Sequence, residues 1–265
     1  MDSTPRQGRF ASLELKPARQ SADQPGDKGW EAPLRDAFFY MNEGLQAELA
    51  GDHEKALNKY STALGENPLH IEAWTAQIWM LLYLKEPIEA QFWADRALES
   101  FPNHPDLLAL KSLSLARCGL TNKAWELNDA ALKGSRESVN VWLARGELRI
   151  AAKWVAAEAC FRRALAISSE RYLTAMRCGD ICLLHNCHAE AEGYFQEALP
   201  GHTSSAWIWY GLGLSRRALG WKTPARAAFA RAVRLVPTDW RYRKSLEQEM
   251  ELGERFKVWL NRAFR

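Results

Sequence analysis

Hydrophobic positions along the middle of the chain recur at the spacing of one face of an α-helix. In one stretch, Ile78, Leu81 and Leu82 follow Trp74 by four, seven and eight residues, which places these side chains on the same side of a helix. The pattern predicts an all-α chain. Prolines occur where a helix has stopped, since proline lacks the backbone N–H that an inner turn needs. They are Pro68, Pro102 and Pro237.

Small residues return along this helical pattern at a fixed period. An alanine recurs at steps of 34, 34, 33, 34 and 34 residues, and a second alanine lies seven residues before each one. A stack of similar helix pairs explains such a period, because each pair must approach its neighbour closely at the same point. The first column is Ala63, Ala97, Ala131, Ala164, Ala198 and Ala232, and the second is Ala56, Ala90, Ala124, Ala157, Ala191 and Ala225.

Two further columns share the period. A mostly aromatic column lies three residues before the first alanine column, at Tyr60, Ala94, Asn128, Phe161, Phe195 and Phe229. A mostly small column lies further upstream, at Gly44, Ile78, Ser112, Gly146, Gly179 and Gly213. Two helices pack about 8–10 Å apart, at the short end of that range only where one offers a small side chain. We therefore expect the small column to mark the helix approach and the aromatic to fill the space beside it.

The best single copy reads Trp209-x-x-Leu212-Gly213, then Ala225-x-x-x-Phe229, then Pro237. It resembles the tetratricopeptide repeat, whose 34 residues carry a tryptophan, a leucine–glycine pair, an Ala-x-x-x-Phe and a closing proline. Trp74, Trp142 and Trp209 occupy the tryptophan column, so we expect them in the core. The fourth copy is one residue short, and we expect the deletion at the turn between its helices. The third copy departs most, with Ser112, Asn128 and Arg136 at the glycine, aromatic and proline positions.

The resemblance implies an α-solenoid of about six helix-turn-helix repeats. The repeats are expected at 37–70, 71–104, 105–138, 139–171, 172–205 and 206–239. Residues 1–33 are rich in Ser, Pro, Gln, Asp and Arg, without the apolar stretch of a signal peptide, and are expected to be a disordered arm. Residues 240–265 are expected to form a basic, amphipathic capping helix, with Thr238 as N-cap candidate and Gly253 as a possible break.

The function of the capping segment has two interpretations. After Gly253, one helical stripe combines apolar and basic side chains: Phe256, Trp259, Leu260, Ala263 and Phe264, with Arg255, Lys257, Arg262 and Arg265 around them. A solenoid needs a terminal helix over its last exposed face, which favours capping. The alternative is an amphipathic element that contacts a membrane or a second subunit.

In tetratricopeptide arrays the first helix of each repeat lines a concave groove. The matching positions in this chain are Phe38, Met41, Leu45, Thr75, Trp79, Leu82, Asp106, Ala109, Leu113, Asn140, Leu143, Glu147, Met176, Asp180, Trp207, Tyr210 and Leu214. This set predicts an apolar groove with three acids, suited to an apolar or amphipathic peptide with a few basic residues. We expect about a third of these side chains to pack against neighbouring helices instead.

Two variations on groove binding follow from particular residues. Chaperone-tail domains of this family clamp a terminal carboxylate with Lys and Asn on the first groove helix, where this chain has Met41 and Leu45; a carboxylate clamp is not expected. Phe10, Leu13 and Leu15 form a short apolar motif in the polar arm. That motif could occupy the groove until a partner displaces it.

Residues that could support a chemical reaction are few. Cys178, Cys182, His185, Cys187 and His188 lie within eleven residues, a combination that could bind zinc. The repeat register instead places Cys178 and Cys182 inside a helix pair as small packing residues, and Cys187 and His188 in a turn. No phosphate-binding glycine loop or Gly-x-Ser-x-Gly elbow occurs, and Gly211-Leu212-Gly213 lies on a helix. We therefore expect no enzyme, cofactor, metal ion or small-molecule substrate.

Cysteine content and charge bear on location and partners. Five cysteines do not form a disulfide framework, and no apolar run of about 18 residues suggests a membrane span, so a cytoplasmic protein is expected. Residues 34–104 contain 5 Lys and Arg against 11 Asp and Glu, whereas residues 206–265 contain 13 against 5. The opposite charges are consistent with a solvated surface, with head-to-tail self-association or with docking on an acidic partner. Nucleic-acid binding is disfavoured because the basic excess is confined to one end.

The sequence therefore predicts a non-catalytic scaffold or adaptor that binds a partner protein or peptide. The alternative is a self-associating assembly factor or peripheral membrane adaptor that acts through its basic C-terminal end.

Overall fold

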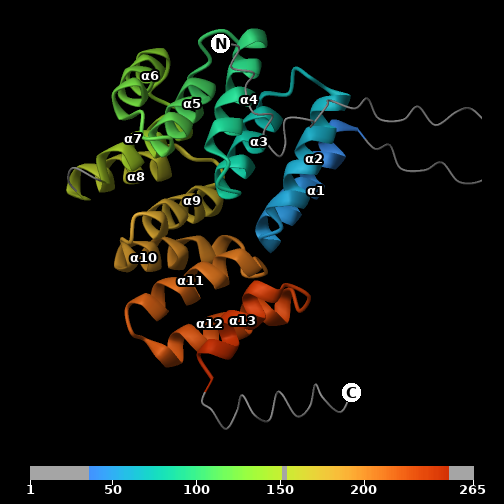
Figure 1. Cartoon of the computed structure of the whole chain (residues 1–265), viewed down its shortest axis with the longest axis vertical. Helices are drawn as coiled ribbons and strands as arrows, with labels where there is room; N and C mark the ends of the chain where they lie inside the picture. The colour runs from blue at the N-terminus through green and yellow to red at the C-terminus, as the bar shows by residue number, and fades with distance from the viewer. Residues whose placement is uncertain (1–35, 151–153, 251–265) are drawn as a thin grey trace, which may run out of the picture. The chain divides into compact units, whose positions relative to one another are not determined.

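The computed structural model describes residues 36–150 and 154–250, with only the backbone at 154–156. Every regular element in these ranges is helical (Figure 1). The α-helices are α1 (Ala37–Ala50), α2 (His53–Glu66), α3 (Ile71–Tyr83), α4 (Pro87–Ser100), α5 (Pro105–Arg117), α6 (Thr121–Gly134), α7 (Val139–Ile150), α8 (Trp154–Ile167), α9 (Arg171–Leu184), α10 (His188–Ala198), α11 (Ala206–Ala218), α12 (Lys222–Leu235) and α13 (Trp240–Gln248). A 3₁₀ turn, η1, covers Leu199–Gly201. The all-α prediction is confirmed.

Several sequence predictions concern residues outside these ranges. They are the arm at 1–33 with its apolar motif, the deletion expected in the turn of the fourth copy, and the stripe that follows Gly253.

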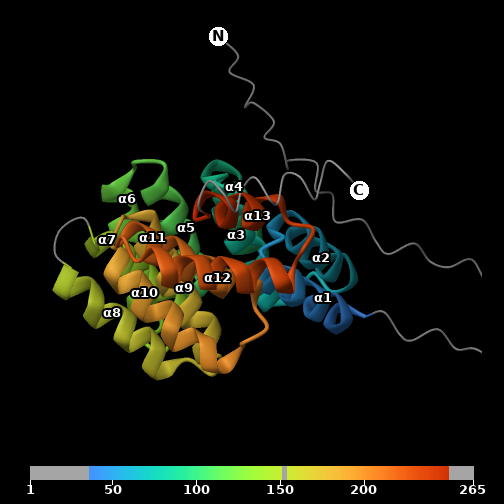
Figure 2. The same ribbon diagram turned by 90° about the horizontal axis from the view of Figure 1, so that it is seen from below.

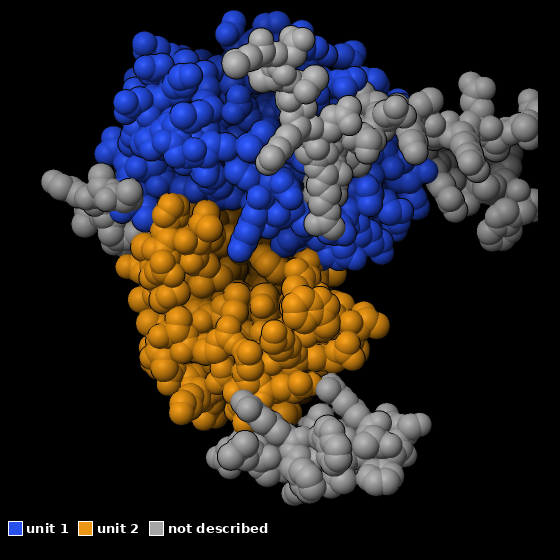
Figure 3. All heavy atoms as spheres, viewed as in Figure 1, with its two compact units in different colours: residues 1–48, 52–163 blue, residues 49–51, 164–265 orange. Residues whose placement is uncertain are grey.

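The chain divides into two compact units (Figure 3). Unit 1 comprises residues 1–48 and 52–163, and unit 2 comprises residues 49–51 and 164–265. Within unit 1, α5 packs beside both α6 and α7; within unit 2, α9 lies beside α10 and α11 beside α12 (Figures 1 and 2). Consecutive helices thus form the pairs that the sequence period predicts.

Inside four of the pairs, a glycine on the first helix faces an aromatic ring on the second. A Cβ added at Gly44, Gly146, Gly179 or Gly213 would lie closer than 3.0 Å to the ring of Tyr60, Phe161, Phe195 or Phe229, respectively. All four rings are buried, and so are both alanine columns. The predicted helix approach is therefore confirmed, since a side chain larger than hydrogen would force the helices apart.

Tryptophans of the repeat signature hold the turn that precedes their own helix. The indole N–H groups of Trp74, Trp142 and Trp209 donate to the carbonyl six residues earlier, at 2.8, 2.8 and 2.9 Å. Trp74 is buried. Trp142 and Trp209 remain partly exposed, so the expectation that all three lie in the core is only partly met.

Five of the first helices end in the same way. A residue with positive φ follows each of these helices: Gly51 directly after α1, and Lys85, Gly119, Asn186 and Gly220 two residues after the ends of α3, α5, α9 and α11. In each case the amide of the residue after the positive-φ residue donates to the carbonyl five residues before it, as from Asp52 to Ala47 at 2.9 Å. This is the Schellman arrangement, in which a left-handed residue ends a helix.

The last described helix, α13, packs on α12 and closes the final repeat. Tyr242 of α13 is fully buried together with Ala206 and Ala232. The N-cap differs from the prediction: Asp239, not Thr238, accepts a hydrogen bond from the Arg241 amide at 2.8 Å. A carboxylate one residue later in the chain simply reaches the free amide of the first turn.

Candidate functional site

Many residues expected to line the groove are buried in the structure. Each has an exposed fraction of 8% or less. They are Trp79, Leu82, Ala109, Leu113, Asn140, Leu143 and Glu147 in unit 1, and Met176 in unit 2. Side chains this deeply buried contribute packing, and they present almost no surface to a partner.

A polar network in unit 1 explains part of this burial. The Trp79 indole N–H donates to the Asn140 side-chain oxygen at 2.9 Å, which joins α3 of the second repeat to α7 of the fourth. The Asn140 amide donates to Asp106 at 2.7 Å, and the Ser138 hydroxyl donates to the same carboxylate oxygen at 2.8 Å. Three residues predicted separately for the groove are thus brought together, but they bind one another.

A second connection in unit 1 is centred on Arg117, at the end of α5. Its guanidinium donates to both carboxylate oxygens of Glu147 at 3.0 and 2.9 Å, and to the Leu82 carbonyl at 3.1 Å. Because Glu147 is almost fully buried, this paired geometry is what makes its charge tolerable.

Other predicted residues of unit 1 remain accessible. Phe38 is 69% exposed, and Met41 and Leu45 follow it by three and seven residues on α1, both partly exposed. This spacing places the three on one side of the helix. Thr75 is also partly exposed, with its hydroxyl bonded to the Glu72 carbonyl at 2.9 Å.

In unit 2, four predicted residues remain partly exposed: Asp180, Trp207, Tyr210 and Leu214. The Trp207 indole N–H donates to the two Asp180 carboxylate oxygens at 3.0 and 3.2 Å. Ring centroids of Trp207 and Tyr210 are 5.7 Å apart, and those of Tyr210 and Tyr242 are 4.8 Å apart. Trp207, Tyr210 and Tyr242 therefore form one aromatic cluster, with Asp180 bonded to Trp207.

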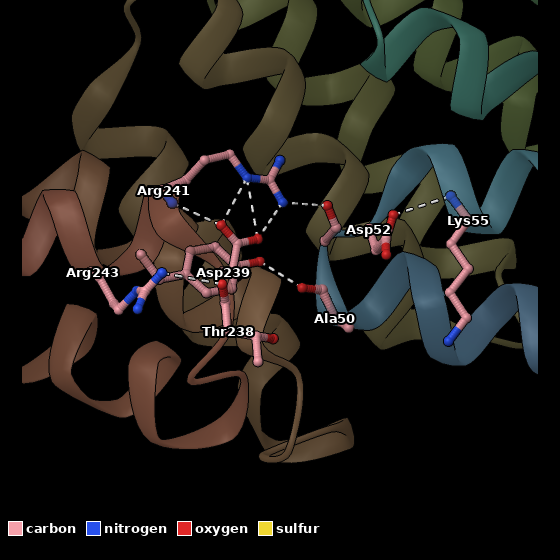
Figure 4. A network of polar contacts seen from close by, with 9 residues as sticks. Ala50, Asp52, Lys55, Thr238, Asp239, Arg241 and Arg243 are labelled. Atoms are coloured by element: carbon pink, nitrogen blue, oxygen red, sulfur yellow. Dashed lines mark hydrogen bonds and ion pairs between the residues drawn. The ribbon is translucent and has the colours of Figure 1, made fainter.

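Two polar residues near this cluster, Asp239 and Arg241, were missed by the sequence analysis (Figure 4). Arg241 forms an ion pair with Asp239 at 2.6 Å and lies with its guanidinium 5.8 Å from the Trp207 ring. Burial raises the pKa of Asp239, but hydrogen bonds and charge from Arg241 outweigh it and hold that pKa below its ordinary value. The Arg241 guanidinium also donates to the Gly51 carbonyl, and the Tyr242 hydroxyl donates to the Ala50 carbonyl.

Solved structures with a similar fold are repeat proteins built from helix pairs. A tetratricopeptide repeat protein from Parabacteroides merdae is 18% identical, with 83% of this chain and 86% of that chain covered and a TM-score of 0.50. The fold is that of a tetratricopeptide-repeat protein. One chain in the crystal structure of the APC/C heterotetramer Cut9–Hcn1 matches at 13% identity and TM-score 0.49, over 82% of this chain but only 43% of the matched one. PilW, a type IV pilus biogenesis factor, matches at 19% identity and TM-score 0.48, over 79% and 98%.

Sequence comparisons add nothing to this result. No protein-family model matches the chain, and no curated protein matches it. At the identities above, the likeness to solved structures concerns the fold.

Two residues of the cysteine cluster lie in the core, and the other three, His185, Cys187 and His188, are partly exposed. Cys178 and Cys182 are fully buried on α9, as the packing interpretation predicted. Burial raises the pKa of the Cys178 thiol well above its ordinary value. Cys187 is the N-cap of α10 and His188 its first residue. Within residues 36–150 and 154–250, no three His, Cys, Asp or Glu side chains are grouped so that they could hold a metal ion.

Among the helices that the structure describes, none has both the length and the apolar character needed to cross a bilayer.

Proposed function

We propose that this chain is a non-catalytic scaffold or adaptor that binds an apolar or amphipathic segment of a partner protein along the first helices of its repeats. The observation that carries the proposal is the exposure of Phe38, which is 69% accessible at a position where the repeat register places partner-facing residues. Burying a side chain of this size contributes about 1.5–3 kcal/mol. Large aromatic side chains of this kind act as anchors in protein interfaces.

The neighbouring residues support an apolar ligand. Met41 and Leu45 extend the accessible stripe of Phe38 along α1, and methionine adapts its shape to different partners. In unit 2, Trp207 and Tyr210 are partly exposed. Asp180 keeps part of its surface accessible, so a basic side chain on the ligand can still approach it.

We also propose a cytoplasmic location. All five cysteines are free thiols, and three of them are buried. A reducing compartment keeps thiols in this state.

The proposed binding of a partner along the first helices is tested by capturing partners with the full chain and with two double variants. Phe38→Ala/Met41→Ala removes the accessible stripe of α1. Ile88→Ala/Phe92→Ala is the matched control, because both residues lie on α4, a second helix, and are 75% and 52% exposed. We expect a partner that the unaltered chain and the α4 variant retain and that the α1 variant loses, with helicity intact in all three. Equal retention by both variants, or loss only with the α4 variant, would overturn the proposal.

A further inference from the structure

Gly51, which follows the last residue of α1, occupies an environment unlike that of equivalent glycines. Gly119 and Gly220 have nearly the same φ, +82° and +79° against +81°, and a Cβ added at either would meet nothing within 4 Å. A Cβ added at Gly51 would lie closer than 3.0 Å to the Tyr242 hydroxyl and the Trp207 ring. The same backbone turn is open at Gly119 and Gly220, whereas side chains of α11 and α13 enclose it at Gly51, which belongs with them to unit 2.

Three hydrogen-bond donors of unit 2 meet the carbonyls of this turn in order. The Schellman arrangement uses the Ala47 carbonyl, which accepts from the Asp52 amide, and leaves the last carbonyls of the helix without a partner in the turn. The Ser205 hydroxyl donates to the Leu49 carbonyl at 2.8 Å. The Tyr242 hydroxyl donates to the Ala50 carbonyl at 2.6 Å, and the Arg241 guanidinium donates to the Gly51 carbonyl at 2.6 Å (Figure 4).

Each donor also has contacts with residues outside the turn. Ser205 is the N-cap of α11 and accepts from the Ile208 amide at 3.2 Å. The Arg241 guanidinium donates to both carboxylate oxygens of Asp239. Tyr242 is fully buried, and burial raises the pKa of its hydroxyl well above the ordinary value, so that it stays a donor. The Arg241 charge also faces the negative end of a helix dipole.

We infer that Ser205, Trp207, Arg241 and Tyr242 form a binding site for the glycine-terminated carbonyl end of an α-helix, and that a second copy of this chain supplies such an end in trans. This helix-end site holds Leu49–Gly51 in the structure, so the same turn of another copy has the fitting shape and donors. Residues 34–104 carry an acidic excess and residues 206–265 a basic one, which favours the approach of one copy to another. The inference goes beyond the proposed function, since it uses main-chain carbonyls and not the Phe38 stripe.

The test mixes two full-length variants, each with one half of the interaction removed. Gly51→Ala blocks the turn and leaves the helix-end site intact and vacant. Arg241→Met/Tyr242→Phe removes two donors and leaves the turn intact. We expect each variant alone to sediment at the monomer mass of 30.1 kDa, and an equimolar mixture to form a heterodimer of twice that mass that weakens as salt is raised.

Gly119→Ala mixed with the donor variant is the control, because it has the same backbone strain at an open turn and should give no heterodimer. Arg241→Met alone serves as a second donor variant if the double variant loses helicity. A mixture that remains monomeric while its components are folded would overturn the inference. Dimers formed equally well by either variant alone would also overturn it, because the association would then use another surface. The Phe38 and Met41 residues are intact throughout, so the outcome is independent of partner capture.

Discussion

Within each repeat, the size of the residue in the small column of the first helix compensates for the size of its partner in the aromatic column of the second helix. Glycine is paired with an aromatic in four repeats, where the ring occupies the space that a Cβ would need. The second repeat instead has Ile78 with Ala94, and the third has Ser112 with Asn128. A core packed at the density of a crystal requires such compensation, since the space between two helices is fixed.

We expect a glycine-to-alanine substitution to change the free energy of unfolding in opposite directions at two positions of unit 2. Gly213→Ala should lower the free energy of unfolding, because overpacking against Phe229 costs about 1–3 kcal/mol and the better helix propensity of alanine returns only about 1 kcal/mol. Gly193→Ala should raise it by up to about 1 kcal/mol, because Gly193 lies within α10 with nothing within 4 Å of an added Cβ. Urea unfolding measures both. A stabilised Gly213→Ala variant would contradict the packing described.

At this scale the sequence predicts packing better than polar contacts. The period alone identified the small and aromatic columns, because packing recurs in every repeat. Gly51, Gly119 and Gly220 also share the repeat register, and that signal could have located the helix ends. Nothing in the sequence associates Gly51 with Arg241, which are 190 residues apart. A repeat period describes local spacing, and it contains no information on a contact between residues so far apart in the sequence.

At the scale of elements, side chains from one first helix bind those of another in unit 1. Trp79 reaches Asn140 two repeats later, and Arg117 connects Leu82 with Glu147. The helical period predicted Trp79 on the first helix of its repeat, and the structure places it on α3. The period could not predict the burial, because that depends on the rotation between successive repeats, which a one-dimensional pattern does not contain.

The Arg117–Glu147 pair predicts a non-additive effect on stability. Arg117→Met should cost about 3–5 kcal/mol, because it leaves a buried carboxylate without its main cation. Arg117→Met/Glu147→Leu should cost clearly less, since two apolar side chains of similar volume remove the buried charge as well. Urea unfolding of the four chains of this cycle gives the coupling energy. A double variant as unstable as the sum of the two single ones would show that the pair is not coupled.

For the molecule as a whole, the structure separates residues that hold the repeats together from residues that remain accessible. The first group includes much of the groove expected from the sequence. The second includes Phe38, Met41 and Leu45 in unit 1, and Trp207 with Tyr210 in unit 2. Side chains that are buried in contacts between repeats cannot contact a partner, so a partner would contact the accessible side chains.

The proposed function requires that a partner contact the accessible side of α1. A photoreactive benzoylphenylalanine in place of Phe38, and in a second chain in place of Phe92, tests it in cells. Both positions are exposed phenylalanines on helices of unit 1, so the two probes report equally on chance encounters. We predict a covalent adduct with one partner protein from position 38 and none with that protein from position 92. The same adduct at both positions, or at position 92 alone, would contradict the account.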